Sequence, residues 1–314
     1  MGKLDDRNAV VTGGGGGIGR EVCLALASEG AKVLVNDVGA ARDGAGSDVS
    51  AADKVVAEIK ERGGTAISNH DSVASFNAAE AMIKMCVDSF GSIDILVNLA
   101  GPLRERMIWN MTEEEWDTVL TVHLKGTFNC SRHACVQMKQ QGRGRIITAV
   151  SDAWRGTVGQ SNYGSAKAGM VGLTRAMARE MGRFGVTANA IAPIAATRMT
   201  LDEGVKAGMK KRLESGLITQ AYYDNLMRMP GPEFVAPMVV FLATDAAANI
   251  NGQVFHIEKG RASIYSEPVE VRAIYKGENG GMWTVDELEE LVPKTLLVGY
   301  TNPAPPQTEE KKSE

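Results

Sequence analysis

The residues best suited to chemistry are a tyrosine and a lysine four positions apart, Tyr163 and Lys167, in the segment GQSNYGSAKAGM. In a helix these two side chains share one face, one turn apart. A lysine ammonium about 4 Å from the phenol, at an effective dielectric of ~20, favours the phenolate by ~4 kcal/mol and brings the tyrosine pKa from ~10 towards ~7. The pair therefore predicts a general acid–base centre that works near neutral pH.

Ser151 is the third candidate, twelve residues before Tyr163 and at the end of an apolar run that predicts a strand. At the carboxyl edge of a parallel sheet, where such sheets bind ligands, its hydroxyl can hydrogen-bond a reacting oxygen. Taken singly, a helical Tyr–Lys pair is usually a solvated surface contact, and a strand-end serine is usually a cap. The three together, downstream of a nucleotide-binding turn, favour a catalytic centre.

That turn is Thr12–Gly19, which reads TGGGGGIG, directly after the first predicted strand and at the start of the first predicted helix. Glycines let the backbone approach a pyrophosphate and adopt positive φ angles. The helix N-terminus adds N–H donors and the positive end of a dipole. A glycine-rich turn alone is weak evidence, but in this strand–turn–helix context it predicts a dinucleotide site.

Asp37 follows the second predicted strand, Lys32–Asn36, where an acidic side chain can accept hydrogen bonds from the adenosine ribose. A carboxylate there repels a 2′-phosphate, so we expect NAD rather than NADP as the cofactor. Arg20 and Arg42 are nearby bases that would weaken this preference.

The elements that position these residues alternate along the chain. Strands are predicted at Ala9–Thr12, Lys32–Asn36, Ala66–Asn69, Asp94–Asn98, Arg145–Val150, Thr187–Ala192 and Val254–Glu258. Helices are predicted near Gly19–Glu29, Ala51–Arg62, Ser75–Phe90, Glu113–Gln140, Asn162–Phe184 and Glu233–Thr244. Strands that are apolar almost throughout are typical of a sheet covered on both faces. The alternation predicts right-handed crossovers and an α/β, doubly wound parallel sheet, a Rossmann fold, in one domain with a C-terminal extension.

Composition excludes several classes of protein. Of the 314 residues, 44% are hydrophobic, enough for a large core, which excludes global disorder. A net charge of −4 argues against a nucleic-acid binder. No run of 18 apolar residues and no secretory-type N-terminus occur, so we expect a cytoplasmic protein that does not span a membrane. The four cysteines lack metal-ligand spacing, so we expect reduced, buried thiols and no metal site.

Over about residues 3–260 these motifs resemble the short-chain dehydrogenase/reductase family, which has a TGxxxGIG turn, a serine and a Tyr-x-x-x-Lys pair. The resemblance implies Tyr163 as the acid–base group, Lys167 as ribose ligand and modulator of the tyrosine pKa, and Ser151 as the anchor of the substrate oxygen. It implies cofactor contacts from Tyr163 and Lys167 and from Gly13, Gly17, Ile18, Gly19, Asp37, Asp71, Ser72, Asn98, Ala100, Gly101, Pro193 and Thr197.

The resemblance also bears on cofactor choice and assembly. Gly16 stands where family members that prefer NADP often carry a base, which again favours NAD. In relatives the helices corresponding to 113–140 and 162–184 form a four-helix interface between subunits, which implies a homodimer or homotetramer. Small residues in Ala166–Ala178 permit close approach of two helices.

Two positions depart from the family pattern. The usual Asn-Asn-Ala-Gly is here Asn98-Leu99-Ala100-Gly101, without the second asparagine. The asparagine that takes part in a proton relay in relatives is replaced by His123. His123 either acts through a water or satisfies a backbone carbonyl, and both interpretations stay open here. The remaining histidines, His70, His133 and His256, have no partner spacing that indicates a metal.

Longer stretches, among them VNDVGAARDGAG and NAIAPIAATRMT, resemble the (3R)-hydroxyacyl-CoA dehydrogenase domain of peroxisomal multifunctional enzymes of type 2 and bacterial single-domain relatives. This resemblance implies NAD-dependent oxidation of a 3-hydroxyacyl-CoA to the 3-oxoacyl-CoA. The alternatives are a dehydrogenase of a free hydroxysteroid, cyclic alcohol or carrier-bound ketone, and a catalytically silent partner subunit.

The sequence patterns predict three segments of the chain. Residues 1–260 form the dehydrogenase domain, and within it 200–232 is a long irregular connection rich in glycine and methionine that we expect to be a substrate lid. Its basic residues would meet CoA phosphates, or else belong to a solvated helical face: Lys206, Lys210, Lys211 and Arg212. Residues 261–301 are an extension expected to pack on the domain or on a neighbouring subunit, and 302–314 a disordered tail.

Overall fold

The computed structural model describes residues 2–46, 48–197, 201, 203–216, 218–277 and 280–304, without the side chains of Glu203, Tyr222 and Asn225. The chain falls into two compact units, residues 1–265 and 266–314. The first unit holds the sheet and the helices that cover it, and the second holds helix α10 (Val285–Lys294).

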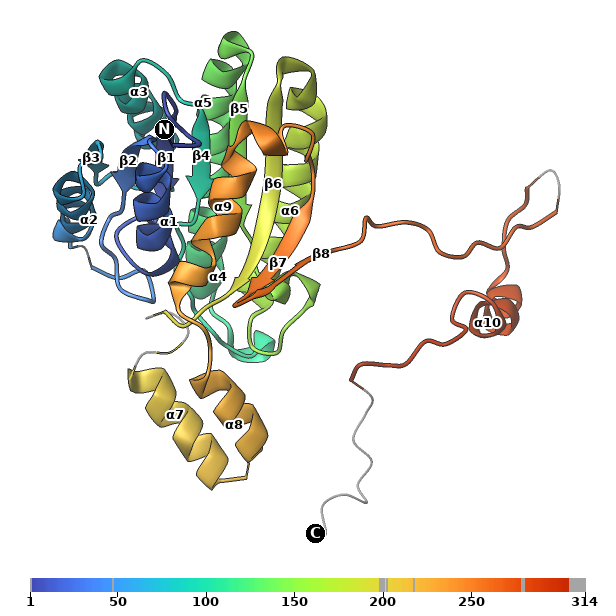
Figure 1. The fold of residues 1–314 in the computed structure, drawn as a ribbon. Helices are drawn as coiled ribbons and strands as arrows, with labels where there is room; N and C mark the ends of the chain where they lie inside the picture. The colour runs from blue at the N-terminus through green and yellow to red at the C-terminus, as the bar shows by residue number, and fades with distance from the viewer. Residues whose placement is uncertain are drawn as a thin grey trace. The chain divides into compact units, whose positions relative to one another are not determined.

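An eight-stranded sheet forms the centre of the first unit, in the order β3-β2-β1-β4-β5-β6-β7-β8 (Figure 1). The strands are β1 (Asn8–Thr12), β2 (Lys32–Asn36), β3 (Ala66–Asn69), β4 (Ile95–Asn98), β5 (Gly144–Ala149), β6 (Val186–Ile194), β7 (Val254–Glu258) and β8 (Arg261–Ile264). Neighbours from β3 to β7 run parallel, and β8 pairs antiparallel with β7. The order reverses between β1 and β4, which is the switch point where doubly wound sheets bind ligands. The predicted Rossmann fold is confirmed, with one antiparallel edge strand added.

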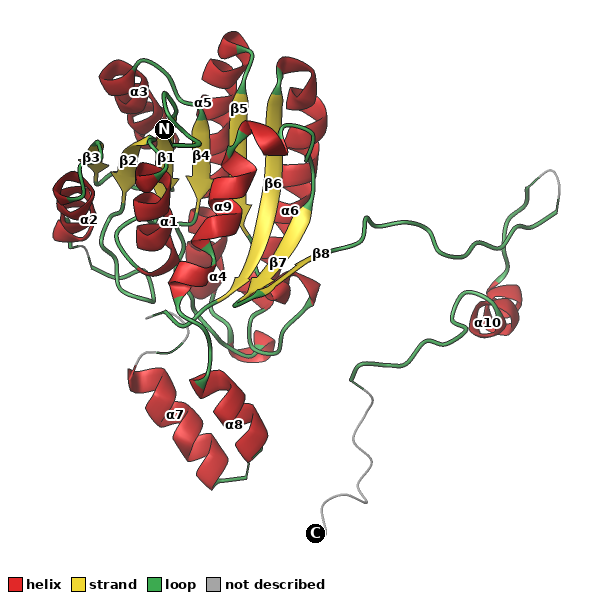
Figure 2. Cartoon of the chain, viewed as in Figure 1, coloured by secondary structure: helices red, strands yellow, loops and turns green. Residues whose placement is uncertain are grey.

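Helices cover both faces of this sheet (Figure 2). On one face lie α1 (Gly17–Ser28), α2 (Ser50–Glu61) and α9 (Ala236–Ala243). On the other lie α3 (Phe76–Phe90), α5 (Gly126–Gln141) and α6 (Ser161–Met181), with α4 (Glu113–Leu120) against α6.

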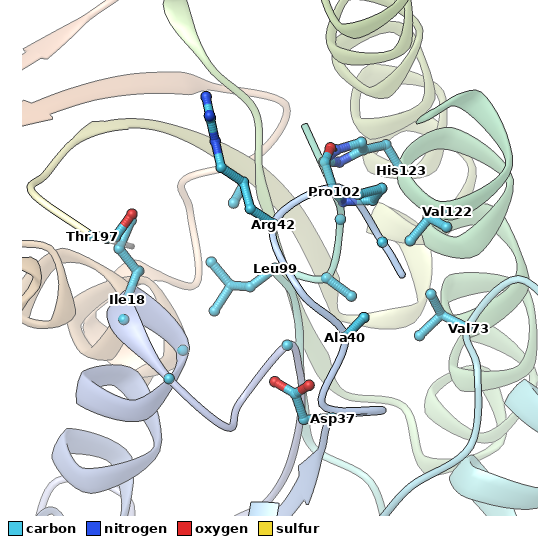
Figure 3. A pocket seen from close by; sticks show the side chains of 18 of the residues that line it. Ile18, Asp37, Ala40, Arg42, Val73, Leu99, Pro102, Val122, His123 and Thr197 are labelled. Carbon is cyan, nitrogen blue, oxygen red and sulfur yellow. The ribbon is translucent and has the colours of Figure 1, made fainter. Parts of the chain in front are cut away.

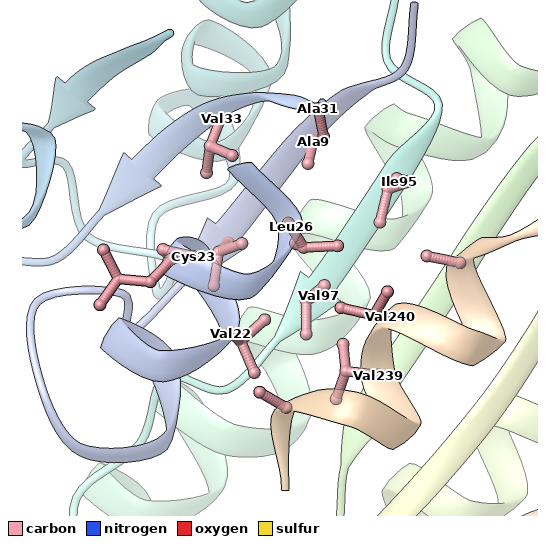
Figure 4. Close-up of a cluster of buried hydrophobic side chains, with 14 of the residues drawn as sticks. Ala9, Val22, Cys23, Leu26, Ala31, Val33, Ile95, Val97, Val239 and Val240 are labelled. Atoms are coloured by element: carbon pink, nitrogen blue, oxygen red, sulfur yellow. The ribbon is translucent and has the colours of Figure 1, made fainter. Parts of the chain in front are cut away.

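Alternate strand residues supply the two halves of the core, because successive side chains of a strand point to opposite faces. Val97 on β4 faces the cluster built with Val22 and Leu26 of α1 and Val239 of α9 (Figure 4). Its neighbour Leu96 faces the second cluster, under α3 and α5. Each such fully buried aliphatic side chain contributes about 1.5–3 kcal/mol, so the strand ends that carry the polar site are held by a rigid frame.

Two predicted elements differ in kind from those observed. The helix predicted over 113–140 is interrupted, because a π-helical turn at Thr121–Lys125 separates α4 from α5. The connection predicted as irregular over 200–232 contains two helices, α7 (Glu203–Glu214) and α8 (Gln220–Met227). Thr200 and Met199 lie outside the described residues. Glycines at 204, 208 and 216 favoured a loop, but a helix tolerates an isolated glycine at a cost of ~1 kcal/mol.

The segment after Gly260 begins as a hairpin, with β8 paired to β7, whereas residues 266–275 have no regular structure. Helix α10 begins with a capping box, in which Thr284 Oγ1 accepts from the Glu287 N–H at 3.3 Å. Most of the predicted tail, residues 305–314, lies outside the described residues.

No helix in the described ranges is long and apolar enough to cross a membrane. The cysteines are free thiols, three of them buried and Cys135 half-buried.

Candidate active site

A cavity of about 390 Å³ opens at the carboxyl ends of the parallel strands, on both sides of the switch point (Figure 3). The site residues predicted from the sequence that line it are Gly13, Gly17, Ile18, Gly19, Asp37, Asp71, Ser72, Ala100, Gly101, Ser151, Tyr163, Lys167, Pro193 and Thr197. Residues that are far apart in the sequence meet here because each follows a strand that ends at the same edge of the sheet.

Asn98 is the exception among the predicted residues. It ends β4 with only 3% of its surface exposed, and its Nδ2 donates to Ser131 Oγ at 3.2 Å. In the described part of the chain it belongs to the core behind the cavity and is absent from the cavity wall. The contact of Asn98 with the cofactor stays a prediction. Its position beside the cavity-lining Leu99 makes it a support for that segment.

The glycine turn has the shape that a dinucleotide requires. Gly13 and Gly17 have φ angles of +69° and +51°, in the left-handed region that favours glycine. A Cβ on Gly13 would lie 2.9 Å from the Ala100 Cα, and one on Gly19 would lie 2.0 Å from the Gly13 oxygen. A Cβ on Gly16 would meet no described atom within 4 Å, so the backbone is open on the side that faces the cavity.

The start of α1 adds donors to this turn. No side chain in the described part of the chain caps α1, and its first turn carries no acidic residue. The first N–H groups of a helix have no partner within the helix, so they are available to a pyrophosphate. Turn and helix start together fit a dinucleotide, with Gly13–Gly19 as the phosphate cradle.

Asp37 is fixed at the ribose end of the cavity. Its Oδ2 accepts from the Gly15 N–H at 2.8 Å and its Oδ1 from the Gly39 N–H at 2.7 Å. These bonds hold the carboxylate between the glycine turn and the loop after β2. A carboxylate has further lone pairs, so it can still accept from ribose hydroxyls.

Two basic side chains near this end are neutralised by ion pairs. Arg20 pairs with Glu58 at 2.6 Å and also with Glu21. Arg42 lines the cavity, and its Nη2 lies 2.7 Å from Glu105 Oε2. Both guanidinium groups already have carboxylate partners, so neither offers an unpaired positive charge to the nucleotide.

Ser151, Tyr163 and Lys167 come together on the cavity wall. Ser151 follows β5 and hydrogen-bonds Tyr163, which lies in the first turn of α6. Lys167, one turn further along α6, is 3% exposed, and its Nζ donates to the Ala149 carbonyl at 2.6 Å. The same Nζ lies 5.3 Å from the centre of the Tyr163 ring. The predicted helical spacing therefore brings the phenol, the amine and the serine hydroxyl to one point.

Burial dominates the electrostatics of this group. It lowers the pKa of Lys167 to about 7. It also raises the pKa of Tyr163 to about 12, although the Ser151 hydrogen bond lowers that pKa. The prediction that Lys167 alone brings the tyrosine pKa towards ~7 is therefore wrong for the chain by itself. The simple Coulomb argument omitted the desolvation of both groups.

His123 is a cavity residue whose role the sequence left open. It lies in the π-helical turn, is 2% exposed, and its Nε2 lies 2.8 Å from the Pro102 oxygen. Since a carbonyl only accepts, Nε2 carries the hydrogen, and the histidine satisfies a backbone carbonyl. Its ring packs edge-on against Tyr163, with 5.2 Å between the ring centres. Burial, and secondarily Lys167, holds its pKa well below the usual value, so the ring is neutral.

Pro102 is a cavity residue that sequence reasoning did not place in the site, and Arg42, which was expected near the cofactor, lines the cavity as well. Pro102 follows the predicted Gly101, so proximity in sequence was an available signal. Arg42 lies in a loop whose path depends on contacts with residues 103–105, and no local pattern indicates that path.

The chain matches the short chain dehydrogenase family over residues 7–206. It belongs to that family. A short-chain type dehydrogenase/reductase of Mycobacterium tuberculosis is 43% identical to this chain, in an alignment that covers 82% of this chain and 84% of that protein. A structure of a short chain dehydrogenase from Mycobacterium avium superposes with a TM-score of 0.79 and 40% identity, covering 97% of this chain and 99% of that one.

Two relatives carry more specific names. The hydroxyacyl-CoA dehydrogenase ChsB1 of Mycobacterium tuberculosis is 38% identical over 91% of this chain and 87% of its own. The mouse peroxisomal multifunctional enzyme type 2 is 40% identical over 82% of this chain, which spans about a third of that enzyme, 32%. The predicted resemblance is confirmed, and the chain is an oxidoreductase acting on a CH–OH group with a nicotinamide cofactor, as its family is.

Proposed function

We propose that this dehydrogenase interconverts a 3-hydroxyacyl-CoA and its 3-oxoacyl-CoA with NAD as the cofactor. The proposed substrate class is supported by the similarity to a hydroxyacyl-CoA dehydrogenase over 91% of the chain. The observation that carries the cofactor is the fixed Asp37 carboxylate on the cavity wall.

The residues of the chain have separate tasks in this reaction. The nicotinamide, when bound, supplies the acceptor for the hydride of the carbinol carbon. Tyr163 Oη takes the proton of the substrate hydroxyl, so that the carbon–oxygen bond becomes a carbonyl as the hydride leaves. Ser151 Oγ hydrogen-bonds the reacting oxygen and orients it towards the phenol. Lys167 binds the cofactor ribose and supplies the positive charge that favours the phenolate.

The family resemblance and the position of each residue on the cavity wall support the remaining cofactor contacts. Gly13, Gly17, Ile18 and Gly19 would hold the pyrophosphate, and Asp71 and Ser72 would contact the adenine end. Ala100 and Gly101 would support the nicotinamide ribose, and Pro193 and Thr197 would contact the carboxamide. Residues in this proposal all line one cavity.

The acid–base role is tested by Tyr163→Phe, which removes only the phenolic oxygen. We expect kcat to fall by at least about 10²-fold, the usual size of a general acid–base contribution. Circular dichroism and the thermal midpoint are expected to stay close to those of the native chain. Normal turnover by this variant would falsify the mechanism.

The cofactor preference is tested by comparing kcat/KM with NAD and with NADP. We expect NAD to be preferred because Asp37 repels a 2′-phosphate and because Arg20 and Arg42 are already paired. Asp37→Ser removes hydrogen bonds from a charged acceptor, worth about 1.5–3 kcal/mol each. It should therefore raise the KM for NAD by about 10–100-fold. A native chain that prefers NADP would overturn the assignment.

The substrate class is tested with a panel of 3-hydroxyacyl-CoA esters, free hydroxysteroids and carrier-bound substrates. The last arm is included because a 3-oxoacyl-[acyl-carrier-protein] reductase of Staphylococcus aureus is 39% identical over 81% of this chain. Met229, which follows α8, lines the cavity, and this position supports the proposal that the segment around it contacts the acyl group. Turnover of only free alcohols would contradict the acyl-CoA assignment.

We further propose a homodimer or homotetramer built on α5 and α6. Phe128 and Val136 on α5 are 45% and 39% exposed, and a Cβ on Gly172 of α6 would meet no described atom within 4 Å. A monomeric sedimentation profile would contradict this assembly. The domain boundaries at 260 and 301 and the cytoplasmic location remain predictions from the sequence.

A further inference from the structure

Asp152, which directly follows Ser151, is held by two residues from the far end of the chain. Its Oδ1 accepts a hydrogen bond from the Tyr265 hydroxyl and lies 3.1 Å from Nδ1 of His256. Asp152 begins a 3-10 turn, Asp152–Arg155, whereas His256 lies on β7 and Tyr265 directly follows β8. Neither the reaction nor the cofactor site described above uses these three side chains.

The pairing of β7 with β8 explains why the two residues reach the same carboxylate. In this antiparallel pair His256 lies opposite Ser263, so their side chains share one face of the sheet. Tyr265 is two residues beyond Ser263 and, by the two-residue repeat of a strand, lies on that face as well. Its N–H donates to the Val254 oxygen at 2.9 Å, which continues the ladder past the end of β8.

The Tyr265 ring also packs on the rest of the 3-10 turn. Trp154 meets it edge-on, with ring centres 5.4 Å apart and an angle of 83° between the rings. The Arg155 guanidinium carbon lies 5.4 Å from its centre, and Arg155 in turn lies 3.8 Å from the Asp152 carboxylate. A single tyrosine thus contacts three residues of the turn.

The turn and Ser151 are connected by hydrogen bonds. Ser151 Oγ accepts from the Ala153 N–H at 3.3 Å, and the Ser151 carbonyl accepts from the Trp154 N–H at 3.0 Å. Because the turn bonds both to the hydroxyl and to the backbone of Ser151, a shift of the turn changes the direction of that hydroxyl.

We propose that His256 and Tyr265 are positioning residues, which fix Asp152 and thereby the orientation of Ser151 Oγ towards the reacting oxygen. The hairpin that carries them, β7–β8, lies beyond the residues 7–206 that match the family. This inference rests on the proposed role of Ser151. It assigns the first residues after Gly260 to the catalytic geometry, where a misplacement of about 1 Å can cost about 10²-fold in rate.

The test is Tyr265→Phe, which removes the hydroxyl but keeps the ring contacts with Trp154 and Arg155. We expect kcat to fall by about 10-fold, while the KM for NAD stays within about 2-fold, because the cofactor site is untouched. Ile264→Ala is the matched control, since Ile264 is on β8, is 57% exposed and points to the opposite face. It should keep the native kcat. The double variant Tyr265→Phe with Asp152→Ala should lose no more kcat than Asp152→Ala alone, because both substitutions break the same hydrogen bond between Tyr265 and Asp152.

Ser151→Ala separates this inference from the proposed function. If Ser151→Ala retains activity, the proposed role of Ser151 fails and this inference fails with it, whereas the proposed substrate class and cofactor stand. If Ser151→Ala is inactive while Tyr265→Phe keeps its kcat, only the positioning role is overturned. Should Tyr265→Phe not fold, as judged by circular dichroism, His256→Gln supplies the same kcat readout, and an unchanged kcat then overturns the inference.

Discussion

At the scale of single residues, the proposed chemistry depends on how many protons the pair Tyr163 and Lys167 carries. A charged phenolate beside an ammonium and a neutral phenol beside an amine contain the same number of protons, so titration does not distinguish them. The pH determines whether the pair carries both of its protons or has lost the first one. Burial lowers the Lys167 pKa to about 7 and raises that of Tyr163 to about 12, so the first proton leaves near pH 7.

This assignment predicts opposite pH profiles for the two directions. Below pH 7 the pair is fully protonated and can donate to a ketone, whereas above pH 7 it can accept a proton from an alcohol. We therefore expect kcat/KM for oxidation to rise with pH through about pH 7 and kcat/KM for reduction to fall. In Lys167→Arg the cation does not titrate, so the inflection near pH 7 should disappear. The same inflection in both proteins would contradict the assignment.

A second prediction concerns the contact between Gly101 and His123. A Cβ on Gly101 would lie 1.8 Å from His123 Cε1, so the two positions are complementary. Gly101→Ala should destabilise the protein by about 1–3 kcal/mol, the usual cost of overpacking. Measured by chemical denaturation, much of that loss should return in Gly101→Ala combined with His123→Ala. A double variant that is destabilised by the sum of the single losses would show that the two residues do not compete for space.

At the scale of elements, the sequence predicted the strands well because their β-branched runs are buried on both faces. Predicting the helices depended on competing local signals. Val205, Met209 and Leu213 recur every four residues, which is helical spacing, yet the glycines of α7 masked it. All the predicted site residues except Asn98 line the cavity, since the fold brings strand ends together. The sequence did not predict the burial of Asn98 or the pKa values, which depend on packing that no local pattern encodes.

Contacts between loops at the cavity support a prediction about cofactor choice. Glu105 Oε2 pairs with Arg42, and its Oε1 accepts from Gln160 Nε2 at 2.8 Å, just before α6. Glu105→Gln removes the negative charge that neutralises Arg42. We expect kcat/KM with NADP to rise relative to NAD by about 1.5–5-fold, because a surface ion pair is worth about 0.2–1 kcal/mol and a freed guanidinium attracts a phosphate.

The control for this variant is Glu114→Gln, which removes a charge that pairs with Arg104 at 3.0 Å. It lies on the neighbouring helix α4 and should leave the ratio of NADP to NAD use unchanged. An equal change in both variants would mean that the general loss of negative charge, and not Arg42, alters the preference.

At the scale of the whole molecule, the core and the cavity belong to one unit. Among the described residues, the three buried clusters draw their members from positions up to 265. Tyr265 packs on the third of them, and the same position ends the first compact unit. These contacts favour a boundary of the folded body at residue 265, and the position 260 that sequence patterns indicated stays a prediction.

Two shortened chains distinguish these boundaries. A chain that ends at Tyr265 keeps every member of the clusters and the contact with Asp152, so we expect a thermal midpoint and a kcat close to those of the full chain. A chain that ends at Gly260 loses β8 and Tyr265, which exposes the edge of β7 and frees Asp152. Its midpoint should fall by about 2–4 °C for each kcal/mol lost. Its kcat should fall at least as far as in Tyr265→Phe, because the hydroxyl and the ring are both gone. If the chain that ends at Tyr265 is as impaired as the shorter one, residues 266–304 contribute to the stability of the body, and the boundary at 265 is wrong.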